Sequence, residues 1–376
     1  MSIESVVIKG PITEAVNKKI TGLYLLERNI ILLSRCGIKK IFLDFTPGDL
    51  ELFNKKILRH IKSSETEIIT DRKITPDKNS LVLKPEIFLQ QHYLNYPDKY
   101  FKKEKGSYLP ILSDELFEVK EKADIKKAEK LISEYIIKNT GGFIAQKINK
   151  RISIPISIKV SKTRIHPNYL TIINIIIGVL SSYFIFLAAD KNYSPKTIYW
   201  YMVLGGFLFQ AASVLDGVDG EVAKYTLKVS KIGGWLDTFG DNTTLLLFLI
   251  SNSYLFYTVM GGTISLITIL ILFVSLSVML SIMVNYLSKF SDSGSLVAYD
   301  REFLQTLPSD DKLVKFALSM KYLTKKEMFS IFFFLIGFTG HIYIIIPMAA
   351  FVLFAAAVIL TRIHFKYIKD FVKGNS

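Results

Sequence analysis

Four aspartates lie at two helix-like spacings in the second half of the chain. Asp216 and Asp219 are three residues apart, and Asp237 and Asp241 are four apart. At these spacings, each pair projects from one face of an α-helix. Clustered carboxylates repel one another and are costly near lipid unless cations neutralise them. All-oxygen ligation favours Mg²⁺, Mn²⁺ or Ca²⁺, and two divalent ions balance four carboxylates, as in two-metal sites for displacement at phosphorus.

Glycines surround these aspartates. Gly217, Gly220, Gly233 and Gly234 all lie within four residues of one of the acids. A glycine lets the backbone approach a ligand closely, so a nucleotide or sugar phosphate can lie against these helices. Tight helix–helix packing is the alternative explanation. For the acids, the alternatives are a structural ion-pair network and a cation-transport path, although transport sites usually lie near mid-bilayer.

Long uncharged stretches place the aspartates on membrane helices. A bilayer core takes about 20 apolar residues per helix. No Asp, Glu, Lys or Arg occurs in 165–189, 197–215, 242–288 or 328–361. The third stretch allows two passes that turn at Gly261–Gly262, and the fourth allows a hairpin that turns at Gly340–His341. We therefore predict six membrane helices, near residues 168–189, 197–224, 233–258, 263–288, 325–340 and 343–366.

The charge distribution predicts how these helices are oriented. With six passes, twenty Lys and Arg residues lie on one side, in 145–165, 224–232, 288–326 and the C-terminal tail. The other side has only Lys191 and Lys196. The positive-inside rule then places both termini and the aspartates on the cytoplasmic side of the cell membrane, in a multi-pass protein. Topology and anionic lipid thus explain the net charge of +14, and nucleic acid is not an expected partner.

The composition excludes several other classes of protein. A single cysteine, Cys36, rules out an internal disulfide and a cysteine-based metal site. The five histidines have no HExxH spacing, which argues against a zinc hydrolase. No apolar run of signal-peptide length occurs near the N-terminus. Residues 1–165 carry a net charge of +11 and residues 166–376 one of +3, so a charged soluble region precedes the membrane region.

The soluble region alternates strand-like and helix-like runs, an order that favours a parallel sheet with helices on its faces. The pattern predicts strands over 5–9, 40–44, 67–70 and 80–84, and helices over 14–36, 50–61 and 123–138. We therefore expect three parts: a small cytoplasmic α/β domain over 1–140, a basic amphipathic surface helix within 141–166, and an α-helical polytopic membrane domain over 167–376.

The acidic region resembles the signature of the CDP-alcohol phosphotransferase (phosphatidyltransferase) family. The signature is matched by Asp216-x2-Asp219-Gly220-x2-Ala223-Lys224-x8-Gly233-x3-Asp237-x3-Asp241. The family's entry motif is similar to Pro167-Asn168-Tyr169-Leu170-Thr171. The resemblance covers residues 141–376. It departs at Lys224, where the family usually has arginine, because lysine keeps the charge but loses the planar fork that binds phosphate.

The resemblance implies a six-helix enzyme of phospholipid biosynthesis that is usually a homodimer. Such an enzyme transfers the substituted phosphoryl group of a CDP-alcohol, either a CDP-lipid or CDP-inositol, to an acceptor alcohol and releases CMP. By the same resemblance, Asp216, Asp219, Asp237 and Asp241 bind two Mg²⁺ or Mn²⁺ ions, and Asp241 is the general base. The residues implied for CDP-alcohol binding are Asn168, Thr171, Gly220, Ala223, Lys224, Ser230 and Gly233.

Residues 25–33 and 36–40 are similar to sugar-nucleotide transferases, and residues 124–130 with 139–144 resemble the junction in fused inositol-phosphate cytidylyltransferase/di-myo-inositol-phosphate-phosphate synthase proteins. The first 140 residues therefore resemble a cytidylyltransferase domain. They depart where a nucleotide would bind. Gly10-Pro11-Ile12-Thr13 is not a glycine-rich phosphate loop, and Leu81–Leu83 runs into Lys84-Pro85 without an acidic metal ligand. We therefore predict a degenerate, non-catalytic domain that serves as a scaffold, dimer contact or regulator.

Other functions and the substrates stay open at this stage. Lys224 is also compatible with a catalytically impaired membrane scaffold or a CDP-alcohol-binding protein, although all four aspartates are intact. A divalent-cation carrier would use the same acids. For a phosphorylated acceptor the candidate is Arg301. The donor can be CDP-diacylglycerol, a CDP-archaeol-type lipid or CDP-inositol.

Overall fold

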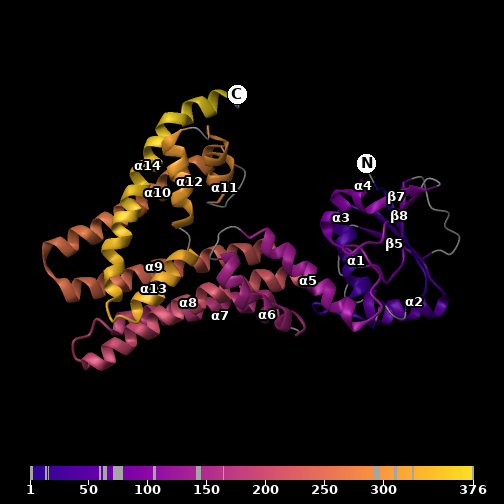
Figure 1. Cartoon of the computed structure of the whole chain (residues 1–376), viewed down its shortest axis with the longest axis horizontal. Helices are drawn as coiled ribbons and strands as arrows, with labels where there is room; N and C mark the ends of the chain where they lie inside the picture. The colour runs from indigo at the N-terminus through magenta and orange to yellow at the C-terminus, as the bar shows by residue number, and fades with distance from the viewer. Residues whose placement is uncertain are drawn as a thin grey trace. The chain divides into compact units, whose positions relative to one another are not determined.

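A six-stranded mixed sheet is the centre of the N-terminal α/β domain in the computed structural model (Figure 1). Strand β1 (Ser5–Lys9) lies between β4 (Lys40–Asp44) and β6 (Ser80–Leu83), and the three are parallel. Consecutive apolar residues of β1 are buried, as expected of a strand covered on both faces. The order is β5-β4-β1-β6-β8-β7, where β5 is Glu67–Ile69 and β7 (Phe101–Glu104) is antiparallel to β8 (Ser107–Pro110).

The structure describes most of the chain. The described residues are 3–12, 15, 17–58, 61, 66–70, 79–104, 107–140, 145–163, 165–290, 297–308, 311–323 and 326–374. Within these ranges, the side chains of 297, 298, 301, 319–323, 326–328 and 369–374 are not described. The expected strands at 5–9, 40–44, 67–70 and 80–84 are confirmed to within one residue.

The helix expected over 14–36 is wrong in its first half. A hairpin of β2 (Lys19–Ile20) and β3 (Leu23–Tyr24) precedes α1 (Leu25–Arg35). Thr21 and Gly22 turn the hairpin with φ of 49° and 87°, the positive values that a tight hairpin turn needs. The other helical elements of the domain are α2 (Pro47–Phe53), the π-helical η1 (Asn54–Leu58), α3 (Gln91–Asn95), α4 (Pro97–Tyr100) and α5 (Lys122–Lys138).

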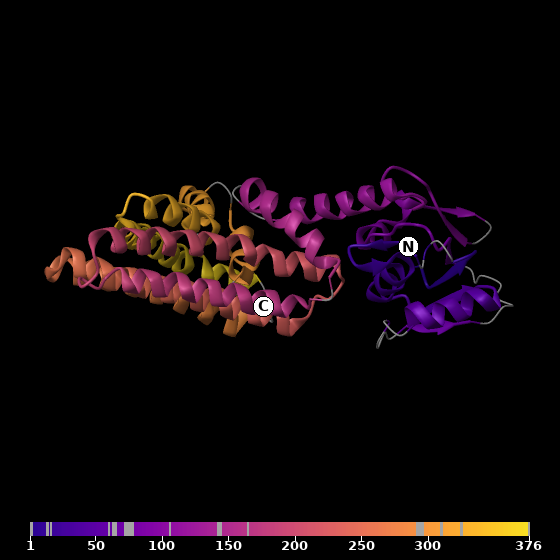
Figure 2. The same ribbon diagram turned by 90° about the horizontal axis from the view of Figure 1, so that it is seen from below.

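Long apolar helices follow. Five segments of the described chain are long and apolar enough to cross a membrane. They are α7 (Pro167–Leu187), α8 (Pro195–Tyr225), α9 (Lys231–Met260), α10 (Gly262–Phe290) and the segment Ile342–Ile368, which combines the 3₁₀ turn η4 (Ile342–Ile344) with most of α14 (Ile345–Gly374). Helix α10 runs along α14, as both views show (Figures 1 and 2). These helices make the chain a membrane protein.

The sixth expected span is shorter than predicted. Helix α13 (Lys326–Gly337) has 12 residues, which is about 18 Å of helix and too little to cross a bilayer core of about 30 Å. Its direction is as expected: it runs antiparallel to α8, because Tyr199 Oη donates to the Phe338 carbonyl and Gly206 lies against Phe333. The turn at Gly340, with φ of 72°, completes the predicted hairpin with α14.

Shorter helices flank the membrane spans. The π-helical η2 (Ala145–Asn149) and α6 (Lys150–Ser161) precede α7, and α11 (Val297–Glu302), η3 (Leu304–Thr306) and α12 (Lys312–Leu323) follow α10. Tyr299 of α11 is buried, with its hydroxyl 3.3 Å from Nδ1 of His364 on α14. The apolar part of the region between α10 and α13 is therefore packed onto α14.

The chain divides into two compact units that do not follow the sequence order. One consists of Met1–Gly141, Arg151–Pro167 and Val218–Ser230. The other consists of Gly142–Lys150, Asn168–Gly217 and Lys231–Ser376. Helix α8 is continuous through residue 217, so its last two turns belong to the same unit as the α/β sheet.

Candidate metal centre and nucleotide site

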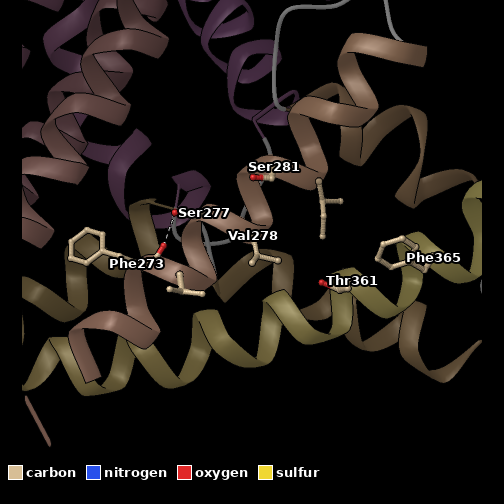
Figure 3. Close-up of a pocket in the computed structure, with 8 residues that line it drawn as sticks. Phe273, Ser277, Val278, Ser281, Thr361 and Phe365 are labelled. Atoms are coloured by element: carbon tan, nitrogen blue, oxygen red, sulfur yellow. Dashed lines mark hydrogen bonds between the residues drawn. The ribbon is translucent and has the colours of Figure 1, made fainter. Parts of the chain in front are cut away.

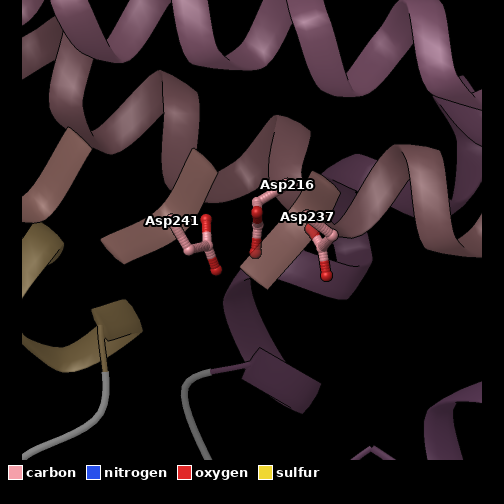
Figure 4. A group of neighbouring side chains, drawn as sticks. All are labelled: Asp216, Asp237 and Asp241. Carbon is pink, nitrogen blue, oxygen red and sulfur yellow. The ribbon is translucent and has the colours of Figure 1, made fainter. Parts of the chain in front are cut away.

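Three of the four predicted aspartates form one group. One carboxylate oxygen from each of Asp216, Asp237 and Asp241 lies within 4.8 Å of the other two (Figure 4). Asp216 comes from α8 and the other two come from adjacent turns of α9. All three side chains are half-buried. Three converging carboxylates provide the oxygen donors that Mg²⁺ and Mn²⁺ prefer, so these residues fit a divalent metal ion.

The helix packing explains how the carboxylates come together. Only five residues join α8 to α9 along the chain. Helix α7 packs tightly on α9: a methyl group on Gly178 would lie 2.5 Å from Thr244 Cγ2, and one on Gly240 would lie 2.5 Å from Ile175 Cγ1. Only glycine permits so close an approach. Helix α7 also orients the group directly, because Asn174 Nδ2 donates to Asp216 Oδ1 at 3.2 Å.

Asp219 does not belong to the group of three. It follows Asp216 by three residues on α8, in the segment Val218–Ser230 of the first compact unit. Its side chain is buried, and its Oδ1 accepts a hydrogen bond from the backbone N–H of Gly220 at 2.6 Å. The expectation that four aspartates act together therefore rests, for Asp219, on the sequence signature.

Gly220 and Gly234, near the aspartates, differ from the tightly packed Gly206. A methyl group added to Gly220 or Gly234 would meet no atom of the described residues within 4 Å. A methyl group on Gly206, in the middle of α8, would instead lie 2.8 Å from the Phe333 carbonyl oxygen. Helix packing therefore explains Gly206 but not Gly220 or Gly234. Open space at these two glycines is what close approach of a ligand requires.

The remaining residues expected to bind the CDP-alcohol fall on three segments. Asn168 and Thr171 lie in the first turns of α7, where Thr171 is buried. Lys224 is exposed and Ala223 half-buried near the end of α8, Ser230 is exposed in the connection, and Gly233 is half-buried in the first turn of α9. Arg301, the candidate for the acceptor, falls in α11, but its side chain lies outside the described residues.

The structure adds polar residues that the spacing argument missed. Asn174 is one, and Glu221 inside the signature is another. Ser153 and Ser157 of α6 each donate to a carboxylate oxygen of Glu221 at 2.6 Å, and all three side chains are buried. The sequence pattern could have indicated a polar contact here, because serines at 153, 157 and 161 lie on one face of a helix. The expected role of α6 as a membrane-surface helix stays a prediction, but this face is packed on α8.

A groove of about 430 Å³ lies elsewhere, between α10 and α14 (Figure 3). Its lining is mostly apolar, including Phe273 and Val278 of α10 and Phe365 of α14. Ser277 faces it, but its hydroxyl donates to the Phe273 carbonyl of its own helix at 2.8 Å. No carboxylate is among the residues that line the groove. It is therefore separate from the aspartate group and lacks groups for phosphoryl chemistry.

Fold and site together define a membrane protein with a convergent carboxylate centre and an attached α/β domain. The family model described as CDP-alcohol phosphatidyltransferase matches residues 164–363, more than half of the 376 residues. The chain belongs to this family and is a CDP-alcohol phosphotransferase family enzyme. The family uses divalent metals, which agrees with the aspartate group.

Curated relatives match only the C-terminal part of the chain. The Bifunctional IPC transferase and DIPP synthase of Archaeoglobus fulgidus is 35% identical over 133 residues, covering 35% of this chain and 24% of that protein. The protein of the same name from Aquifex aeolicus is 36% identical over 119 residues, which are 31% and 24% of the two chains. The Archaetidylinositol phosphate synthase of Pyrococcus horikoshii is 33% identical over 120 residues, covering 31% of this chain and 54% of that protein. The chain thus spans about a quarter of the bifunctional relatives and about half of the third.

Proposed function

We propose that the protein transfers the substituted phosphoryl group of a CDP-alcohol to the hydroxyl of an acceptor alcohol, with release of CMP. The observation that carries this proposal is the convergence of Asp216, Asp237 and Asp241 within 4.8 Å, on the two helices that bear the family signature. Phosphoryl transfer depends on positioning and on neutralising charge around phosphorus. A compact group of carboxylates, with open backbone at Gly234 on one of the same helices, serves both needs.

The aspartates would hold the metal. In this proposal Asp216, Asp219, Asp237 and Asp241 bind two Mg²⁺ or Mn²⁺ ions, which stabilise the attacking and leaving oxygens when they are bound. Asn174 holds Asp216 in one orientation through the 3.2 Å hydrogen bond. Fixing a ligand in this way strengthens a metal site.

Other side chains would handle the proton and the nucleotide. Asp241 is the candidate general base, because a carboxylate at the edge of such a group can accept the proton of the acceptor hydroxyl. The exposed ammonium of Lys224 would contact a phosphate of the CDP-alcohol, and the bare backbone at Gly220 would let the nucleotide lie against α8. Ser230, Asn168 and Thr171 would supply further polar contacts.

The orientation and the assembly are part of the same proposal. Connections on the aspartate side of α7 to α10 are rich in Lys and Arg, whereas the opposite side has Lys191 and Lys196. The positive-inside rule therefore favours the aspartates on the cytoplasmic face of the cell membrane. A water-soluble nucleotide product would leave directly into that compartment. We further propose a homodimer, on the family resemblance.

Two observations guide the choice of substrates to test. One relative is named Archaetidylinositol phosphate synthase, and two others carry the name Bifunctional IPC transferase and DIPP synthase. We therefore propose donors of two kinds, a CDP-lipid and CDP-inositol, and we place inositol phosphate first among the acceptors. Glycerol phosphate, serine and inositol complete the set.

The test is release of CMP by the purified full-length protein in detergent. Each donor is combined with each acceptor in the presence of Mg²⁺ or Mn²⁺, and CMP is measured. We expect release with one pair, its loss in Asp241→Asn, and full activity in Asp190→Asn, a control in the α7–α8 connection. Release that persists in Asp241→Asn would overturn the assigned base. Binding of CDP-alcohol with no release from any pair would favour a scaffold or binding protein, and cation transport into vesicles that contain the protein, without release of CMP, would favour a carrier.

A further inference from the structure

The end of α8 is built in an unusual way. The backbone N–H of Lys228 donates to the carbonyl of Ala223 at 2.8 Å, and Leu227 adopts the left-handed conformation with φ of 52°. This is the Schellman arrangement that ends a helix, but the left-handed position is normally a glycine. Leucine is tolerated there because its side chain packs against the core of the α/β domain. The helix end is thus held by that domain.

Side chains from the α/β domain satisfy the last carbonyls. Arg28 Nη1 donates to the Tyr225 carbonyl at 2.9 Å, and the single hydroxyl proton of Thr21 is shared between that carbonyl, at 2.9 Å, and the carbonyl of Ile20, at 2.8 Å. Arg35 Nη2 donates to the Leu227 carbonyl at 2.6 Å, but this bond is exposed to solvent. Carbonyls at a helix C-terminus have no partner within the helix, so these donors replace water. Arg28 and Thr21 do so in a site closed to solvent.

Burying the charged side chain of Arg28 at this helix end is energetically costly. Its side chain is 3% exposed, and within the described residues no carboxylate forms an ion pair with it. Burial lowers the pKa of Arg28 to about 10, so the guanidinium still carries its charge near neutral pH. What faces the charge is the C-terminal end of a 31-residue helix, where the helix dipole is negative. A buried cation is thereby balanced by the helix that it holds.

The rest of the helix end is equally enclosed. Tyr225 is fully buried, and its hydroxyl shares a hydrogen bond of 2.6 Å with Ser133 of α5. Glu221 is held by Ser153 and Ser157 of α6. Three helices, α1, α5 and α6, therefore fix one face of Val218–Ser230. The other face of the same segment carries the open Gly220 and the exposed Lys224.

We propose that Arg28 is a positioning residue for the CDP-alcohol: it holds the last two turns of α8 so that Gly220 and Lys224 are presented to the nucleotide in a fixed geometry. This inference rests on the proposed function for the identity of the ligand. It gives the α/β domain a direct part in substrate binding without any catalysis of its own.

The first test measures the helix end itself. Amide hydrogen exchange is followed over residues 218–228 in the full-length protein in detergent, for the wild type, Arg28→Met and Arg35→Met. We expect exchange in this segment to rise at least about tenfold in Arg28→Met, the loss of one charge-assisted hydrogen bond, and to change little in Arg35→Met. The strands β1, β4 and β6 should keep their protection in both. Unchanged exchange over 218–228 in folded Arg28→Met would overturn the proposal, whether or not the wild type releases CMP.

The second test separates positioning from stability. With the donor–acceptor pair found for the wild type, Arg28→Met should raise the KM for the CDP-alcohol at least about tenfold, with a smaller change in kcat, and Arg28→Lys should recover part of the loss. The Mg²⁺ requirement should not move. Equal KM in folded wild type and Arg28→Met would overturn the proposal. If Arg28→Met fails to fold, Thr21→Val replaces it, since valine keeps the shape and removes the second donor to Tyr225.

Absence of CMP release in the wild type would count against the proposed function, and the exchange experiment would still decide whether Arg28 orders the helix end.

Discussion

Two glycines on α8 should respond in opposite ways to the same substitution. Gly220→Ala adds a methyl group that meets no described atom within 4 Å, whereas Gly206→Ala adds one 2.8 Å from the Phe333 carbonyl oxygen. Within a helix, alanine is more favourable than glycine by about 0.5–1 kcal/mol. We therefore expect Gly220→Ala to raise the melting temperature by roughly 1–4 °C. Overpacking should make Gly206→Ala less stable by about 1–3 kcal/mol.

The effects on kcat/KM should be the reverse of those on stability: Gly220→Ala should be the less active variant and Gly206→Ala the more active one. If the nucleotide lies against the bare backbone of α8, the new methyl group of Gly220→Ala enters its space. A steric penalty of about 1–3 kcal/mol lowers kcat/KM by roughly 5- to 150-fold. Gly206→Ala lies 14 residues away on the same helix and should keep kcat/KM near the wild-type value in the fraction that stays folded.

The two variants are compared by thermal unfolding and by CMP release in the same detergent. Wild-type kcat/KM in Gly220→Ala would refute the idea that a substrate passes against this residue. If the melting temperature of Gly220→Ala fell as far as that of Gly206→Ala, the conclusion that a methyl group at Gly220 meets no neighbouring atom would be refuted. Either result would leave Gly220 with a role in the folding of α8 alone.

Three further predictions concern side chains that the structure brings into contact. Asn174→Leu removes the hydrogen bond to Asp216 and should raise the Mg²⁺ concentration for half-maximal CMP release by about 10- to 100-fold, as a metal titration would show; an unchanged requirement would contradict the role of Asn174. Glu221→Leu removes the carboxylate that accepts from the hydroxyls of Ser153 and Ser157 and should cost about 1–3 kcal/mol in thermal unfolding, which replacing both serines with alanine in the same chain should largely restore. Burial lowers the pKa of His92 from its ordinary 6.5, so the unfolded chain binds a proton that the folded domain does not, and stability should fall as the pH drops below about 6.5. A His92→Asn variant should lose this dependence when unfolding is measured at several pH values.

Elements with a strong local pattern could be predicted from the sequence. Ser5–Lys9 and Lys40–Asp44 form strands as expected, because consecutive apolar and β-branched residues suit a buried parallel sheet. The turns at Gly261–Gly262 and Gly340 also appear where two glycines or a glycine and histidine interrupt uncharged stretches. The spacing of the aspartates predicted that four of them converge, because residues three or four apart share a helix face. The structure groups Asp216, Asp237 and Asp241, and Asp219 lies outside that group.

Other features depend on contacts that a local pattern does not contain. The helix expected from residue 14 failed because the apolar residues Ile20 and Leu23 suit a hairpin as well as a helix, and the positive φ of Thr21 and Gly22 decides between them. The buried Arg28 could not be recognised as a helix cap, because its partner Tyr225 is 197 residues away in the sequence. Long-range hydrogen bonds of this kind have no signature in a single sequence.

The route of the chain through its first compact unit has a consequence for synthesis. The cluster formed by Ile20, Leu25, Phe88 and Ala128 is completed by Ile154 and Tyr225. Ribosomes make a chain in order from the N-terminus, so α7 and α8 must be synthesised before Tyr225 is available. The α/β domain therefore emerges with an open hydrophobic surface and reaches its final packing only after two membrane helices have followed it. A chain that ends at Gly141 should expose that surface and associate. In the full chain, Ile154 and Tyr225 should cover the same surface.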